Sequence, residues 1–190
     1  MKRLFFFATV CFCAIILDSS SLWSQALPSG ISINKKEGFK ALKNFNVLKD
    51  GDRVLFLIDY TDAVFKGYSQ EEISSDYGKD EWDREITSLR DVFIYTMEEE
   101  FGRRSILFFK NDNPNIKYKL ILKVISIDKR GNLTGNVFLY DYTDDSHPIA
   151  STGLHGKGGR IGSFMNLMGD GHRSAAESLG KFLRGKIRRN

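Results

Sequence analysis

The sequence predicts an α+β fold, with a mainly antiparallel sheet of about five strands and two main helices packed on it. The first observation is residues 118–143, where two apolar-rich runs flank a polar turn at 128–132 that contains Gly131. Side chains alternate between the two sides of a strand, and both runs show this alternation. Glycine readily adopts the positive φ that tight hairpin turns need. We therefore expect a β-hairpin, lying centrally in a sheet that helices partly cover, because both of its faces carry apolar groups.

The second observation is a helical repeat over residues 80–101. Apolar side chains recur there at spacings of three and four, which places them on one side of an α-helix. Acidic residues occupy the first turn, where negative charge suits the helix dipole, and Gly102 follows the last turn. The stripe, which we expect to lie in the core, contains Trp82, Ile86, Leu89, Phe93, Met97 and Phe101.

The remaining elements follow from shorter patterns. Residues 53–60 are apolar on both faces and predict a strand, and residues 63–79 predict a connecting loop with a helical turn at 70–75. In chain order, the others are short strands over 105–110 and 148–152, the second at a sheet edge, and a final helix over 172–187 with Ala176, Leu179, Leu183 and Ile187 as its apolar stripe.

The first 26 residues have the pattern of a secretory signal peptide. Lys2 and Arg3 precede an apolar run of 14 residues, which is shorter than the roughly 20 that span a bilayer. We expect cleavage after Ala26, a loose mature N-terminus over 27–43, and a single α+β domain over 44–190. The mature chain would then lack a transmembrane segment and reside in the periplasm or be secreted; an uncleaved anchor is the alternative.

The two cysteines of the chain, Cys11 and Cys13, both lie in this apolar run. Val10 and Phe12 precede them, where a lipidation site would need a small residue, so a lipoprotein is disfavoured. Cleavage would leave no cysteine, which excludes disulfides, thiol catalysis and Cys-ligated zinc from the mature chain. A cysteine-free exported domain of this size is typical of bacteria.

Length, composition and net charge limit the kind of domain and the kinds of partner that we expect. The chain has 190 residues, of which 42% are hydrophobic, and this is enough to build one packed domain. The formal net charge of +4 is a mild excess that does not by itself indicate nucleic-acid binding, because nucleic-acid-binding proteins gather Lys and Arg on one face. We therefore expect no nucleic-acid partner.

One heptapeptide occurs almost twice. Residues 56–62 read FLIDYTD and residues 138–144 read FLYDYTD, which are identical at six of seven positions. A duplication would explain the similarity, but the flanking sequences differ. The preferred interpretation is two strands with similar ends, where Asp and Thr begin a turn through bonds from side chain to backbone.

No catalytic residue, cofactor site or metal site is predicted. The glycine-rich residues 153–162 lack the Lys-Ser/Thr of a phosphate loop, and the three histidines lack metal-ligand spacing. The carboxylates fit a solvated helix face and a strand end, and there is no nucleophile elbow. We expect a protein that is not an enzyme; the alternative is a small periplasmic hydrolase, which a pocket joining His155, Asp170 and His172 would favour.

Several separated segments match one pattern. They are residues 45–51 (FNVLKDG), the strand end Asp59-Tyr60-Thr61, the glycine pair at 158–159 and the Gly-Lys of the last helix at 180–181. Together they resemble a family of small exported Bacteroidetes proteins of unknown function, over about residues 44–187. The resemblance implies export and no assigned reaction, so it gives no catalytic residues. Thr61 replaces the usual Ser, and Asp50 departs from the LKG-type turn.

The predicted function is an exported, non-enzymatic envelope or secreted protein that binds a protein or a surface component. Residues 153–169 combine many glycines with apolar side chains, which suits an adaptable contact surface. The alternative is a flap that covers the sheet. The basic C-terminal residues complement a helix C-terminus, in preference to binding an anionic surface. The candidate binding surface contains Leu154, Ile161, Phe164, Met165 and Met168.

Overall fold

The computed structural model describes residues 44–101 and 106–187. The expected signal peptide over 1–26 and the mature N-terminus over 27–43 lie outside these residues. The elements are the 3-10 helix η2 (Asn44–Val47), β1 (Arg53–Asp59), β2 (Val64–Phe65), β3 (Tyr68–Ser69), α1 (Gln70–Tyr77), α2 (Lys79–Phe101), β4 (Leu107–Phe109), β5 (Tyr118–Ile127), β6 (Leu133–Asp141), β7 (Ala150–Gly156) and α3 (Phe164–Lys186).

The α+β class is confirmed, but the sheet is mixed rather than mainly antiparallel, and the described residues form seven strands rather than about five. Strand β1 pairs in parallel with β4 and β5, while β5, β6 and β7 form an antiparallel series. The short strand β2 is parallel to β5 and antiparallel to β3. The parallel pairs arise because α2 carries the chain back along the sheet before β4 and β5, as crossover connections do.

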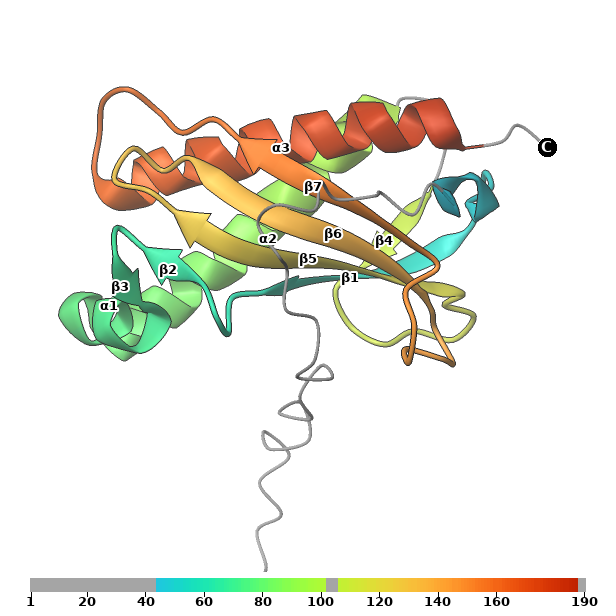
Figure 1. Cartoon of the computed structure of the whole chain (residues 1–190), viewed down its shortest axis with the longest axis horizontal. Coiled ribbons are helices and arrows are strands. Elements are labelled where there is room, and N and C mark those ends of the chain that lie inside the picture. Colours follow the sequence, from blue (N-terminus) through green and yellow to red (C-terminus); the bar gives the residue numbers. More distant parts are fainter. Residues whose placement is uncertain (1–43, 102–105, 188–190) are drawn as a thin grey trace, which may run out of the picture. The chain divides into compact units, whose positions relative to one another are not determined.

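The two long helices cover one face of the sheet. Figure 1 shows α2 and α3 side by side behind the strands, and the shorter α1 beside β2 and β3. The predicted stripe of α2 is confirmed as core: Phe93 is fully buried, and its ring stacks on Phe56 of β1 with centroids 5.0 Å apart. Alternate residues of β5, such as Leu120 and Leu122, complete this core from the sheet side.

The central hairpin is confirmed. Strands β5 and β6 pair along their whole length, and β5 lies between β1 and β6. In the turn, Gly131 has a φ of 75°, and the Asp128 carboxylate accepts the N–H groups of Arg130 and Asn132. The register shifts between Val124 and Ser126, which marks a β-bulge near the end of β5.

Three elements are longer than the sequence predicted. Helix α1 runs over Gln70–Tyr77 because Ser69 and Glu72 form a capping box. Strand β7 runs over Ala150–Gly156 rather than 148–152, and α3 begins at Phe164 rather than near residue 172, after the N-cap Ser163. The glycines that suggested a loop allow close packing instead: a Cβ on Gly156 would overlap the carbonyl of Gly171.

The ends of β1 and β6 share the expected turn chemistry. The Asp59 carboxylate accepts the Thr61 N–H at 2.9 Å, and the Asp141 carboxylate accepts the Thr143 N–H, also at 2.9 Å. The repeated heptapeptide is oriented differently in the two strands, because Phe56 is in the core and Phe138 is not. Local turn formation therefore accounts for the shared residues.

Candidate functional site

The face of the sheet opposite α2 and α3 is the main candidate site, and we call it the outer face. Its side chains come from the alternate positions of β1, β5, β6 and β7 that do not join the core. Within residues 44–101 and 106–187, no helix packs on it (Figure 1). The outer face consists of Arg53, Leu55, Leu57, Asp59, Lys119, Ile121, Lys123, Thr134, Asn136, Phe138, Tyr140, Ser151 and His155.

An apolar row crosses the middle of the outer face. The strand register places Leu57 opposite Ile121, and Ile121 opposite Phe138. All three side chains are half-buried. Cross-strand neighbours of this kind lie about 5 Å apart and contact one another. Near the bulge, Ile125 and Val64 extend the apolar surface, with 42% and 44% of their areas exposed.

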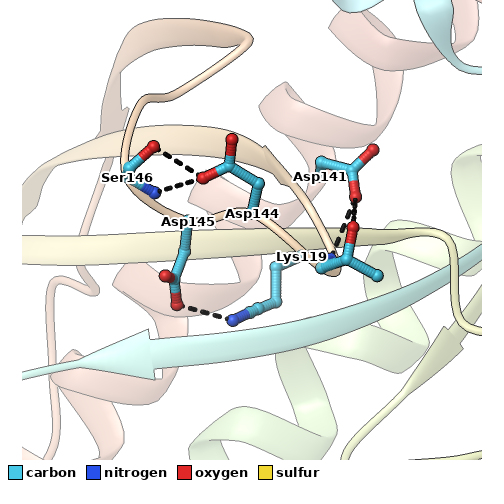
Figure 2. Close-up of polar contacts among 6 residues, drawn as sticks. Lys119, Asp141, Asp144, Asp145 and Ser146 are labelled. Carbon is cyan, nitrogen blue, oxygen red and sulfur yellow. Dashed lines mark hydrogen bonds and ion pairs between the residues drawn. The ribbon is translucent and has the colours of Figure 1, made fainter.

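Each lysine of the outer face has a carboxylate partner. Lys123 Nζ lies 2.7 Å from the Asp62 carboxylate, and Lys119 Nζ lies 2.8 Å from the Asp145 carboxylate (Figure 2). The hydrogen bond and charge of Lys119 lower the pKa of Asp145. Because both ammonium groups are paired, a partner that covers the apolar row would not have to desolvate an isolated cation.

The end of the outer face where β6 finishes is rich in carboxylates. Figure 2 shows Asp141 and Asp144 turned toward the loop that follows each of them, while Asp145 reaches Lys119. Asp141 accepts from the N–H and hydroxyl of Thr143, and Asp144 accepts from those of Ser146. These hydrogen bonds lower the pKa of both carboxyl groups, so they are ionised well below neutral pH.

The residues that would have favoured an enzyme do not come together. His172 is fully buried between α3 and the sheet, where its Nε2 lies 2.7 Å from the Tyr60 hydroxyl. His155 is on the outer face beside Thr134. Asp170 forms an ion pair with Arg173. Among the described residues, no group of three or more His, Cys, Asp or Glu side chains is placed to hold a metal ion.

The five residues of the predicted binding surface differ in burial. Leu154, Phe164 and Met168 are buried in the core, and Met165 is half-buried against it. Ile161 is 92% exposed in the link between β7 and α3. This burial agrees with the alternative in which the apolar groups of the segment cover the sheet. Of the basic residues near the C-terminus, Arg184 donates to the Glu100 carbonyl in the last turn of α2, so it complements the end of α2 rather than that of its own helix.

A small hollow lies away from the outer face, and the sequence did not predict it. It measures about 390 Å³ and opens between the first turns of α1 and α2, lined by Thr61, Ser69, Gln70, Glu71, Ser74, Lys79, Trp82 and Asp83. Trp82 Nε1 is buried and has no hydrogen-bond partner among the described residues. The lining mixes polar side chains with the ring of Trp82, and it shares no residue with the outer face.

Fold and site together define an α+β domain with an apolar sheet face that ends in carboxylates. No family model matches the chain, and no curated protein matches it, so the resemblance to exported Bacteroidetes proteins stays a prediction. Among solved structures, a PelC dodecamer from Paraburkholderia phytofirmans carrying a leucine-to-methionine change is 14% identical, covers 74% of this chain and 92% of that chain, and has a TM-score of 0.42. The dodecamer without this change is also 14% identical, with 74% and 91% coverage and a TM-score of 0.40. In the part of the chain that the structure describes, no helix is both long and apolar enough to cross a membrane.

Proposed function

We propose that this is an exported, non-enzymatic protein of the cell envelope or the secreted fraction that binds a protein or a surface component through the outer face. The observation that carries the proposal is the apolar row of Leu57, Ile121 and Phe138 on a face that the described helices leave open. Export is supported by the charged start, apolar run and small-residue cleavage pattern of residues 1–26.

The pairing of β1 supports a covered outer face. Strands with parallel neighbours on both sides normally have both faces buried, and they read as continuous apolar runs. Strand β1 has β4 and β5 as parallel neighbours and reads VLFLI through its middle. Its core side meets α2, so the same argument favours a binding partner on the other side.

The test is a pull-down of the tagged mature protein from its own cell envelope. The variant Ile121→Ser with Phe138→Ser removes the centre of the apolar row, and we expect it to lose the partner that the wild-type protein captures. The control Tyr95→Ser removes a 64% exposed aromatic ring from α2, and it should keep that partner. Equal capture by all three proteins would refute the outer face as the binding site. Mass measurement of the exported protein checks cleavage after Ala26.

A further inference from the structure

A basic surface lies at one end of the sheet, apart from the outer face. It consists of the turn between β5 and β6, residues 128–132, and the link between β7 and α3, residues 157–163, and we call it the tip (Figure 1). The Gly158 N–H donates to the Asn132 side chain at 2.9 Å, and a Cβ on Gly158 would overlap the Arg130 carbonyl. The turn and the link are therefore packed together, and their side chains form one surface.

The tip gathers cations without matching carboxylates. The side chains of Lys129, Arg130, Lys157 and Arg160 are exposed, and none of them forms an ion pair with a described residue. Asp128 supplies the negative charge of the tip, so four positive charges against one negative charge leave an excess of three. Its carboxylate accepts hydrogen bonds from the turn that it caps.

The neighbouring charged groups do not remove this excess. Asp170 of α3 lies beside Gly159 of the link, and it forms an ion pair with Arg173. Lys66, whose N–H donates to the Ile127 carbonyl just before the turn, adds a further cation. Figure 1 shows β2 and β3 between the tip and α1, whose first turn is acidic. The charge of the tip therefore favours an anionic partner.

An exposed apolar side chain accompanies these cations. Ile161 is 92% exposed and directly follows Arg160 in the link. One exposed apolar side chain is ordinary on a protein surface, but beside several cations it suits the surface of a bilayer, where phosphates lie above an apolar layer. Nucleic acid offers phosphates without that layer, and residues 128–132 and 157–163 contain no aromatic ring that would stack on bases.

We infer that the tip binds the surface of an anionic phospholipid bilayer, with Ile161 inserted among the headgroups and the cations against the phosphates. The contact is reversible, because stable anchoring to a membrane takes more than one such signal. The tip shares no residue with the outer face, so this inference goes beyond the proposed function and does not depend on it.

The test is co-sedimentation of the protein, purified from its own cells, with vesicles of phosphatidylcholine alone or of equal parts phosphatidylcholine and phosphatidylglycerol. Binding to the mixed vesicles should be at least tenfold stronger at low salt, and added salt should weaken it. Lys157→Gln with Arg160→Gln should weaken it roughly 25-fold, at about fivefold for each cation. Ile161→Ser should weaken it about tenfold. The fluorescence of Ile161→Trp should shift to shorter wavelength on binding, because the new ring leaves water, while the buried Trp82 gives a constant background.

Two matched controls separate the tip from general charge attraction. Lys49→Gln with Lys181→Gln removes two exposed cations elsewhere, and Tyr95→Ser removes an exposed ring from α2; both should bind the mixed vesicles as the wild-type protein does. All these variants change exposed residues, so their unfolding temperatures should stay close to that of the wild-type protein.

Equal binding to both kinds of vesicle, or equal losses in the controls and the tip variants, would overturn the inference. An unshifted emission of Ile161→Trp on bound vesicles would also overturn it. So would wild-type binding by Ile161→Ser, or displacement of the vesicles by double-stranded DNA at equal phosphate concentration, because the tip would then be a general anion-binding surface.

Discussion

Acid should unfold this protein through His172. The imidazole is fully buried between α3 and the sheet, with 2.7 Å contacts to the Met168 carbonyl at Nδ1 and to the Tyr60 hydroxyl at Nε2. Since a carbonyl can only accept, Nδ1 carries the proton, and Nε2 must accept from the hydroxyl of Tyr60. Protonation at Nε2 would break this hydrogen bond and place a positive charge in the core.

The size of the effect follows from the pKa of His172. Burial lowers this pKa from the ordinary 6.5 to about 4. At about 1.4 kcal/mol for each pH unit, the difference corresponds to about 3 kcal/mol of unfolding free energy. Between pH 6.5 and about 4 the unfolded chain holds the proton and the folded protein does not, so stability falls as the pH falls. The contribution is complete above pH 6.5 and is lost by about pH 4.

The assay is urea unfolding of the wild-type protein and of His172→Gln at pH 7, 6, 5 and 4. Carboxyl groups with lowered pKa values, such as Asp128, also reduce stability in acid, so the difference between the two pH profiles is the quantity to measure. We expect the wild-type protein to lose about 3 kcal/mol more than His172→Gln. His155→Gln, at an exposed histidine, should follow the wild-type profile. Parallel profiles for the wild-type protein and His172→Gln would refute the reasoning.

Three further changes test the fold. Gly171→Ala should strongly destabilise the protein in thermal unfolding, because the new Cβ would overlap the Gly131 carbonyl. The control Gly185→Ala has no neighbour in reach, and it should be neutral or stabilise α3 by up to about 1 kcal/mol. Equal effects of the two changes would contradict the close-packing argument. Phe93→Asp should prevent folding by placing an unpaired charge in the core, and a folded variant by circular dichroism would show that the stripe of α2 is not buried. Ser69→Ala should cost about 1 kcal/mol in urea unfolding by removing the cap of α1, and no change would mean that the capping box does not contribute to stability.

The elements that could be predicted are those with a local signal. The stripe of α2 and the alternation in β5 and β6 are visible in the order of residues, because each periodicity follows from backbone geometry. The first turns of α3 were missed because Gly169 and Gly171 weaken a helix. A glycine is needed at position 171 because the backbone there contacts the Gly131 carbonyl, about 40 residues away in sequence. The local sequence pattern gives no sign of this contact.

Part of the outer face could be predicted from the sequence, and part could not. Ile121 and Phe138 could be assigned to the same side of the hairpin as their neighbours two positions away, but the sequence does not state which side the helices cover. The parallel pairing of β1 with β5, which completes the apolar row with Leu57, is a long-range contact. For His172, the bond to Met168 four residues earlier resembles any helical spacing, so burial of its ring had no sequence signal.

The turns that follow β1 and β6 supply the carboxylates that pair with the two lysines of the outer face. Strands β1 and β6 flank β5 and run in opposite directions, so their ends lie at opposite ends of β5. At one end Asp62 follows the turn of β1 and pairs with Lys123; at the other, Asp145 follows the turn of β6 and pairs with Lys119. In β1 the strand end and the charge pair come from the same heptapeptide, whereas in β6 the pairing residue Asp145 lies one position beyond the repeat. Because each lysine of β5 has a carboxylate beside it, a partner that covers the face between them buries ion pairs instead of isolated cations, and an isolated buried cation is the costlier case.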